Sequence, residues 1–301
     1  VLKPSSEQQP TLEVPGRVLV LVAAFLGWMF AGWEMSLVPL AARSATIGML
    51  QEDTAHADWL RSAQAAAKAK AAGAGQISPT QEDDIQRLNK AVGEWFAKYI
   101  AAFLFGAALG GLVFGWFGDW AGRARAMGVS ILWYAGFTGL SYFVRSPFEL
   151  SALRFVACMG IGGMWPAGVA LVSEAWPDVS RPMLAGLIGT SANVGIALLG
   201  ITVSAIGAQA VGYQLTPDSW RWMFLLGAAP ALVGLFVLIF VPESPRWLAR
   251  RNQKADQPVA SPIAEVFRPP LLKLTISGIA LGTIPLLGAW GAQKWMIPWA
   301  A

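Results

Sequence analysis

A long uncharged segment constrains this chain more than any other feature of its sequence. No charged residue occurs between Arg154 and Glu174. A helix of about 20 residues crosses the roughly 30 Å hydrocarbon core of a bilayer. Comparable apolar runs occur elsewhere, and the chain is 55% hydrophobic and only 13% charged. Soluble domains carry about 25% charged residues. The sequence therefore predicts an integral membrane protein.

Six spans are predicted within residues 17–242, followed by a seventh. Their approximate bounds are 18–40, 99–118, 126–144, 150–173, 183–210, 222–241 and 271–290, with Pro285 expected to interrupt the last. The other segments are polar: a tail at 1–16, a loop at 44–97 and a linker at 243–270. Residues 271–301 are expected to begin a second group of spans.

The 44–97 segment is interpreted as a long aqueous loop because it is polar and alanine-rich. Within it, Ser78-Pro79-Thr80-Gln81 is a helix-start signal: Ser78 can cap, proline suits the first helical position, and Gln81 lies three residues after the cap. We expect a helix that starts here and continues into the second span. His56 also lies in this loop, where a solvated role is expected.

Basic residues in the short loops predict the orientation of the chain. One set of loops carries Arg123, Arg125, Arg181 and the cluster from Arg246 to Lys254, and the opposite short loops carry only Arg145 and Arg221. Lys and Arg are enriched in cytoplasmic loops. We therefore expect a cytoplasmic amino terminus, a position in the cytoplasmic (inner) membrane, and an external 44–97 loop. Topology also accounts for the net charge of +4, so no nucleic-acid partner is expected.

Charged motifs occur at the ends of several spans. Between the second and third spans stands Gly115-Trp116-Phe117-Gly118-Asp119-Trp120-Ala121-Gly122-Arg123-Ala124-Arg125. The fourth span carries Arg154 near its start and is followed by Glu174, Pro177 and Arg181. The sixth opens with Trp220-Arg221-Trp222 and closes with Pro242-Glu243-Ser244-Pro245-Arg246. In this order and spacing the motifs resemble the major facilitator superfamily, and especially its sugar porter branch.

The resemblance covers about residues 17–250 and implies an all-α fold. In that fold an amino-terminal six-helix bundle of two inverted 3+3 repeats is followed here by a seventh helix. A complete member has twelve spans, so we expect this sequence to be a fragment or a truncated product whose carboxy-terminal half is absent. We expect the protein to work as a monomer once the second half is present.

The resemblance also implies a cytoplasmic gating motif, in which charges at the ends of packed helices hold one conformation and separate in another. Its members here are Gly115, Asp119, Gly122, Arg123, Arg125, Glu174, Arg181, Glu243 and Arg246. Trp120 and Ala124 depart from the family pattern, which usually has a basic residue at the position of Trp120.

Two charges, Glu34 and Arg154, are expected inside spans. A charge within the bilayer costs about 2.5–3.5 kcal/mol on insertion scales, so it usually faces the protein interior. Glu34 lies about 10 Å and Arg154 about 6 Å inside the outer ends of the first and fourth helices, close enough in depth to pair. In the resembled proton-coupled sugar porters an acidic residue of the first helix neighbours this arginine. The resemblance thus implies that Glu34 is a proton-coupling site tuned by Arg154; the alternative is a static buried pair that fixes helix packing.

Four further residues are candidates for solute binding. Trp28, Trp33 and Trp165 offer stacking surface, and Asn193 offers amide hydrogen bonds near the position where the resembled porters place a polar sugar contact. For each tryptophan, a lipid-facing or interfacial position is the alternative.

We therefore expect a secondary active transporter that moves a small polar solute, a sugar or an organic acid, by proton symport and alternating access. Alternatives are an uncoupled facilitator and a non-transporting membrane sensor on the same fold. An enzyme is not expected, because no metalloprotease, nucleophile-elbow or phosphate-loop motif occurs. With one cysteine, Cys158, no cysteine-based metal site is expected either, and no cofactor beyond the coupling proton.

Overall fold

The computed structural model describes residues 12–52, 57–73, 78–209, 220–253 and 265–288. All of its regular elements in those ranges are helices. The chain divides into two compact units, Val1–Ala249 and Arg250–Ala301, which are treated separately. The only helix that lies wholly in the described part of the second unit is α11 (Leu272–Gly288). All the residues discussed as a site lie in the first unit.

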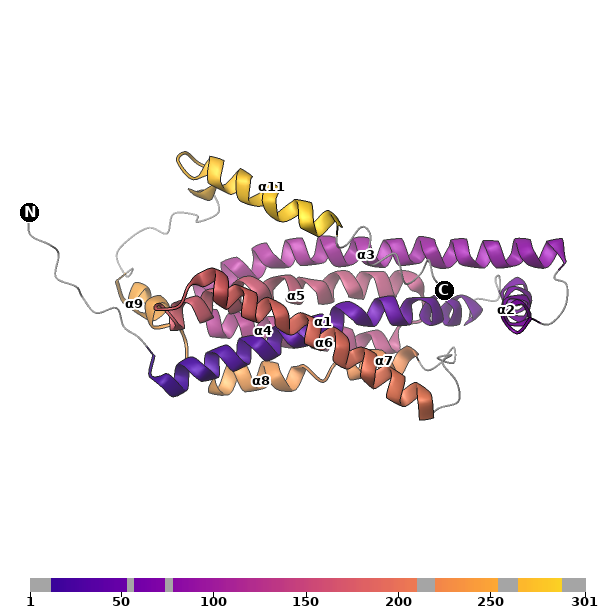
Figure 1. The fold of residues 1–301 in the computed structure, drawn as a ribbon, viewed down its shortest axis with the longest axis horizontal. Helices are drawn as coiled ribbons and strands as arrows, with labels where there is room; N and C mark the ends of the chain where they lie inside the picture. Colours follow the sequence, from indigo (N-terminus) through magenta and orange to yellow (C-terminus); the bar gives the residue numbers. More distant parts are fainter. Residues whose placement is uncertain (1–11, 53–56, 74–77, 210–219, 254–264, 289–301) are drawn as a thin grey trace, which may run out of the picture. The chain divides into compact units, whose positions relative to one another are not determined.

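The first unit is a bundle of long helices. Its elements are α1 (Val14–Glu52), α2 (Ala57–Ala71), α3 (Pro79–Ala121), α4 (Arg123–Leu140), the short helix η1 (Ser141–Phe143), α5 (Pro147–Ala175), α6 (Arg181–Gln209), α7 (Trp220–Leu226), α8 (Ala231–Phe240) and the start of α9 (Pro245–Gln253). In Figure 1, α3 and α5 run side by side, and these two helices pack extensively on each other.

Five described segments are long and apolar enough to cross a membrane: α1, α3, α5, α6 through Ala205, and Trp220–Phe240. The all-α, multi-pass membrane architecture is thereby confirmed. The predicted third span corresponds to α4, which falls outside this group because it begins with Arg123 and Arg125. It packs along α5 and α8, so much of its surface contacts protein and it needs fewer apolar residues than a lipid-exposed span.

The start of α3 agrees with the sequence prediction in detail. The Ser78 side chain accepts a hydrogen bond from the Gln81 backbone at 3.3 Å, and the Gln81 side chain accepts one from the Ser78 backbone at 3.0 Å. Pro79 occupies the first turn. From there a single helix continues to Ala121, so the expected continuity of this helix into the second span is confirmed.

The predicted loop at 44–97 is largely helical, which corrects the sequence interpretation. α1 continues to Glu52, α2 follows, and α3 has already begun at Pro79. We call this segment the helical insert. Its helices bury a small core of their own, made of Ile47, Leu60, Ala63, Leu88 and Val92. Burial of these side chains offsets the loss of conformational entropy when the segment becomes ordered. The polar composition of the segment hid this small core from sequence analysis. His56 lies outside the described residues.

In two predicted spans, the helix is broken or continuous where the sequence indicated the opposite. The sixth consists of α7 and α8, separated by a turn at 227–230. Pro230 supplies no N–H and stands immediately before α8, where proline is tolerated at a helix start. By contrast, α11 continues past Pro285, where a break was expected. Helices also continue through Pro39 in α1 and Pro166 in α5, as they often do in membrane spans, where neighbouring groups satisfy the freed carbonyls.

Glycines allow α3 and α5 to approach closely. The α-carbons of Gly106 and Gly110 face the backbone of Phe155 and Met159, and a β-carbon at either glycine would overlap those carbonyls. Gly162 of α5 faces α3 in the same way. Small residues at a helix interface let backbones pack closely, which is a main source of helix association in a membrane.

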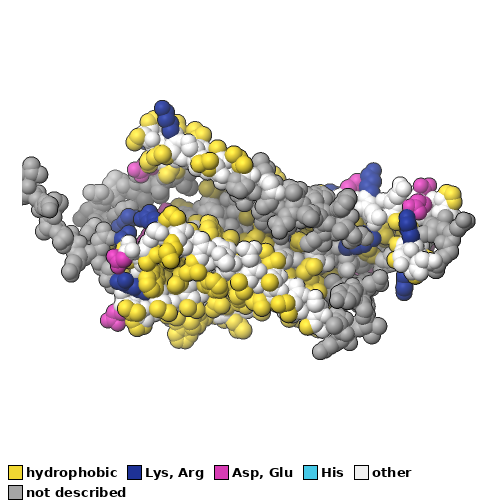
Figure 2. All heavy atoms as spheres, in the orientation of Figure 1, with side chains coloured by type: hydrophobic (Ala, Val, Ile, Leu, Met, Phe, Trp, Pro, Cys, Tyr) yellow, Lys and Arg dark blue, Asp and Glu magenta, His cyan; other side chains and the backbone are white. Residues whose placement is uncertain are grey.

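The surface of the first unit matches a bilayer environment. Figure 2 shows hydrophobic side chains over the middle of the bundle, with charged side chains gathered towards its ends. Large apolar side chains such as Phe105, Leu112, Ile201 and Leu232 are exposed. Exposed apolar area on this scale would be a liability in water but is suited to contact with lipid.

Candidate functional site

A buried ion pair joins α1 and α5. The Glu34 residue is 0% exposed and Arg154 is 1% exposed. Arg154 Nη1 lies 3.5 Å from Glu34 Oε2. The structure therefore brings together the two charges that the sequence placed inside spans. The proton-coupling role assigned to them stays a prediction.

A threonine lies between the two charges, and sequence reasoning missed it. Thr138 of α4 donates a hydrogen bond to Glu34 Oε2 at 2.8 Å, and its oxygen accepts one from Arg154 Nη1 at 3.3 Å. Arg154 Nη2 also contacts Cys158 Sγ at 3.5 Å. The polar side chain of Thr138 within a predicted span was the available signal, but threonine bonds helix carbonyls so often that it does not by itself indicate a site.

The pair leaves some of its hydrogen-bonding capacity unused. Among the described residues, Glu34 Oε1 and Arg154 Nε have no hydrogen-bond partner. Gly227, at the end of α7, lies against Glu34 Oε1, and a β-carbon there would crowd that oxygen. The carboxylate is thus enclosed by α1, α4, α5 and the turn after α7. An incompletely satisfied buried charge is costly, so this arrangement is sensitive to changes in its neighbours.

A second charged cluster lies where α3, α5 and α8 end and α4 begins. Asp119 and Arg123 form an ion pair at 2.6 Å across this corner, and Arg123 Nε lies 4.0 Å from Glu174 Oε1. The Glu243 carboxylate accepts hydrogen bonds from the backbone N–H of Arg123 at 2.7 Å and of Ala124 at 3.0 Å. A carboxylate at this position satisfies the free N–H groups of the α4 start and complements its helix dipole.

Gly122 makes the approach of Glu243 possible. Its φ is +112°, in the region that favours glycine, and a β-carbon there would overlap the Glu243 carboxylate. Two residues that were not assigned to the gating motif complete the cluster. Ser244 donates a hydrogen bond to Glu174 Oε2, and Trp247 Nε1 donates one to the Asp119 carbonyl at 2.9 Å.

Among the described residues, the other predicted gating residues form no ion pair with this cluster. Gly115 has open space beside its α-carbon. The exposed Arg125 side chain donates to the Ala121 carbonyl at 3.5 Å, and the Arg125 backbone N–H donates to Glu243 Oε2, also at 3.5 Å. Arg246 forms no ion pair with another described residue. From the predicted set, the structure thus gathers the side chains of Asp119, Arg123, Glu174 and Glu243, together with Gly122 and the backbone of Arg125. Their gating role stays a prediction.

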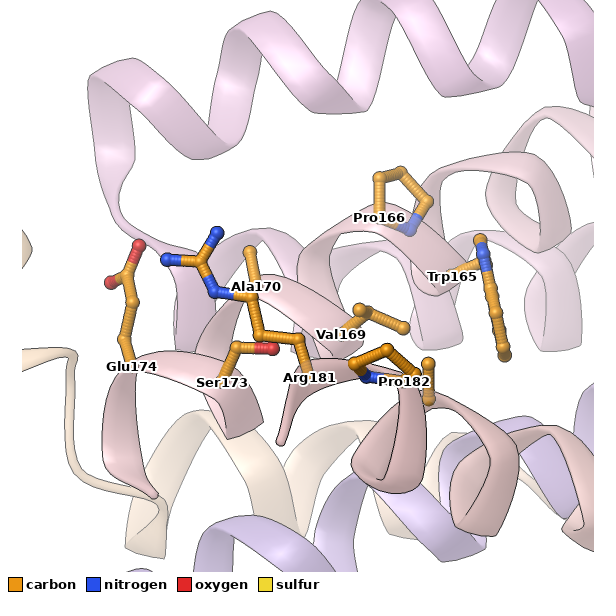
Figure 3. Close-up of a pocket in the computed structure, with 9 residues that line it drawn as sticks. Trp165, Pro166, Val169, Ala170, Ser173, Glu174, Arg181 and Pro182 are labelled. Atoms are coloured by element: carbon orange, nitrogen blue, oxygen red, sulfur yellow. The ribbon is translucent and has the colours of Figure 1, made fainter. Parts of the chain in front are cut away.

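Arg181 lines a cavity, together with Glu174 of the cluster. This cavity between α5 and α6 has a volume of about 520 Å³. Ser173, Glu174 and Arg181 line one end, and Trp165 and Pro166 line the other (Figure 3). It combines an aromatic surface with a guanidinium, a carboxylate and a hydroxyl group, a combination that suits a small polar molecule.

Of the four residues predicted to contact the solute, only Trp28 and Trp165 lie against each other. The rings of Trp28 and Trp165 lie 4.6 Å apart with a tilt of 48°. Trp33 packs instead towards Phe30, at 6.3 Å, and its buried Nε1 has no partner among the described residues. Asn193 is exposed on α6. A binding role for these four residues stays a prediction.

These observations define a class of protein: a multi-pass helical membrane protein with a buried ion pair among its spans and a charged cluster where several spans end. The chain belongs to the Major Facilitator Superfamily, whose family model matches residues 83–298. The family resemblance read from the motifs is thereby confirmed.

Similar proteins agree with this assignment. The chain is 33% identical over 153 residues to an inner membrane metabolite transport protein of Escherichia coli, covering 51% of this chain and 33% of that protein. It is 29% identical over 157 residues to the arabinose-proton symporter of Bacillus subtilis, covering 51% of this chain and 33% of that protein. The fold is similar to that of the xylose transporter XylE from E. coli, with a TM-score of 0.57, 20% identity, and coverage of 80% of this chain and 52% of XylE. The chain thus spans a third to about half of the length of these proteins.

Proposed function

We propose that the protein is a secondary active transporter of the cytoplasmic (inner) membrane that moves a small polar solute by alternating access, coupled to protons. The observation that carries this proposal is the buried Glu34–Arg154 pair. Family membership and the named relatives, which include a proton symporter, support transport rather than catalysis.

The geometry suggests how a proton could be coupled to a change of conformation. As long as Arg154 stays beside it, the Glu34 carboxylate is compensated. A movement of α5 relative to α1 would leave both charges buried and unpaired, at a cost of several kcal/mol. Uptake of a proton by Glu34 removes one of these charges. Protonation and separation of the pair therefore favour each other, which links proton binding to rearrangement.

The charged cluster around Glu243 is proposed to hold one conformation at the cytoplasmic end. It fastens the start of α4 to the segment after α8 through the Glu243 carboxylate, and to α3 through Asp119 and Arg123. Each contact depends on charge and on distance, so it is lost when the helix ends separate.

The solute is proposed to be a sugar or an organic acid. A sugar is favoured by the Trp28 and Trp165 rings, since aromatic faces pack against the apolar faces of sugar rings, and by the named arabinose symporter. An organic acid is favoured by Arg181, whose guanidinium can bind a carboxylate in the cavity of Figure 3.

The test is transport in liposomes that contain the protein as its gene encodes it. The probes are radiolabelled D-xylose, L-arabinose, benzoate and succinate, each assayed with and without an imposed proton gradient. We expect gradient-driven accumulation of one probe. We expect Glu34→Gln to abolish accumulation but to retain exchange of that probe across the membrane.

Other outcomes would assign another function. Equilibration that a proton gradient never drives to accumulation would establish a facilitator and remove Glu34 from proton coupling. Accumulation that is unchanged in Glu34→Gln would leave symport in place but locate the proton elsewhere. No flux of any small sugar or organic acid through a folded protein would favour a sensor.

A further inference from the structure

Thr138 contacts the proposed proton site but has no role in the mechanism described above. It is a completely buried residue, and its hydroxyl contacts both members of the ion pair. The direct contact between Arg154 Nη1 and Glu34 Oε2 is 3.5 Å, whereas charge-assisted N–H···O bonds are usually about 2.7–2.9 Å. Of the hydrogen bonds that the Glu34 carboxylate accepts from described residues, the one from Thr138 is the shortest, at 2.8 Å.

Chemistry dictates the direction of both hydrogen bonds. An ionised carboxylate can only accept and a guanidinium can only donate. The Thr138 hydroxyl must therefore donate to Glu34 and accept from Arg154 while Glu34 is ionised. A hydroxyl is suited to this position because it donates and accepts at the same time, and because it can rotate.

Rotation matters once Glu34 carries a proton. The protonated carboxyl can donate a hydrogen bond to Thr138, and the hydroxyl can then turn its own proton towards a backbone carbonyl one turn earlier in α4, a common bond for threonine in helices. Thr138 can thus serve Glu34 in both protonation states. Arg154 can still donate to the carbonyl oxygen of protonated Glu34, but it cannot accept the new O–H, because a guanidinium has no acceptor.

We propose that Thr138 is a positioning residue of the proton site, which holds Glu34 and Arg154 in a paired arrangement that can still separate. This inference rests on the proposed function, because it assumes that Glu34 exchanges a proton during transport. Other titratable groups that interact with Glu34 are Tyr134 of α4, whose hydroxyl donates to the Gly27 carbonyl, and Cys158 of α5. The α7 end presents Gly227, which has no titratable group.

Two substitutions at Thr138 separate its hydroxyl from its shape. Thr138→Val removes the hydroxyl and keeps a branched side chain, and Thr138→Ser keeps the hydroxyl. Thr202→Val is a matched control, since the one hydrogen bond of the Thr202 side chain within the described part of the chain stays in its own helix, donating to the Leu198 carbonyl at 2.8 Å. In the liposome assay, we expect Thr138→Val to reduce gradient-driven accumulation tenfold or more with exchange retained within twofold. Thr138→Ser and Thr202→Val should behave like the unmodified protein.

A second measurement does not depend on the solute. Infrared difference spectroscopy during a pH titration of the purified protein detects the carbonyl stretch of a protonated carboxyl, and loss of a band in Glu34→Gln assigns it to Glu34. Loss of one hydrogen bond to a charged group changes the midpoint of its titration by about one pH unit. We expect the midpoint of the Glu34 band to be displaced by about that much in Thr138→Val and unchanged in Thr138→Ser.

The outcomes distinguish this inference from the proposed function. If Glu34→Gln removes coupling and its band is found, but Thr138→Val changes neither accumulation nor the midpoint, the inference alone is wrong. Equal losses of accumulation and exchange with an unmoved midpoint would show a merely structural role and would also overturn it. If no band is lost in Glu34→Gln and accumulation persists, the proton role of Glu34 fails, and the inference fails with it.

Discussion

At the scale of single residues, the Glu34–Arg154 pair shows how a charge can be kept inside a membrane protein. Neither side chain reaches water, and the contact between them is a single one at 3.5 Å. A buried pair of this kind is weak evidence for stability, because the desolvation of both charges opposes their attraction. The pair matters for stability when one partner is removed, because the other charge is then buried without compensation.

This cost can be measured. Arg154→Met removes the cation and leaves the Glu34 carboxylate buried without compensation, so we expect it to lower the free energy of unfolding by about 3–5 kcal/mol. The double variant Glu34→Gln/Arg154→Met removes both charges and should recover most of that loss. Unfolding in detergent, followed by tryptophan fluorescence, provides the measurement. A single Arg154→Met variant as stable as the unmodified protein would show that the carboxylate is compensated by other groups.

At the scale of elements, the close contact between α3 and α5 depends on the absence of side chains. Gly106 and Gly110 of α3 face the backbone of α5, and Gly162 of α5 faces that of α3. Glycines recur four positions apart along this part of α3, a spacing that favours the close approach of another helix. Only the structure shows which glycines take part, because Gly115 follows the same spacing and faces open space.

Two alanine substitutions on α3 should therefore have opposite effects. Alanine is favoured over glycine in a helix by about 1 kcal/mol, so Gly115→Ala should be neutral or slightly stabilising. In Gly110→Ala the new methyl group overlaps the Met159 carbonyl, and we expect a loss of about 1–3 kcal/mol through separation of the helices. Thermal unfolding of both variants in the same detergent compares them directly. Equal stability of the two would mean that α3 and α5 are not in close contact.

At the scale of the whole first unit, charges gather at its two ends and apolar surface lies between them. One end holds the cluster around Glu243. At the other, Arg221 donates to the Tyr142 and Val144 carbonyls at 3.0 and 2.6 Å and forms an ion pair with Glu52 at 3.0 Å. These contacts tie the start of α7 to η1 and to the part of α1 that enters the helical insert. The apolar surface between the two ends is the part that we expect to lie in the bilayer.

The proposed orientation predicts which end faces the cytoplasm. Cys158 is the only cysteine in the chain and is buried, so single cysteines introduced at exposed positions can be labelled selectively. Ala71 in the helical insert and Ser180 in the α5–α6 turn are both exposed. With intact cells and a membrane-impermeant maleimide, we expect labelling of Ala71→Cys and labelling of Ser180→Cys only after permeabilisation. The reverse pattern would place the amino terminus outside the cytoplasm.

The sequence by itself determined the class of protein and the order of its motifs. The reason is that a bilayer imposes a minimum length and an apolar composition on every lipid-facing span, and both can be read along the chain. It also predicted the start of α3, because Ser78 and Gln81 act on each other over three residues. The pairing of Glu34 with Arg154 could be anticipated because both charges needed compensation at a similar depth.

The tertiary structure decided the features that depend on contacts between distant residues. Polar composition concealed the core of the helical insert, since Ile47, Leu60 and Leu88 meet only after three helices have packed. The sequence also did not indicate that Thr138 and Gly227 lie beside Glu34. Their positions there follow from the packing of α4 and of the α7 end on α1. Local sequence specifies a helix through interactions over a few residues, whereas the environment of a buried charge is built from several helices at once.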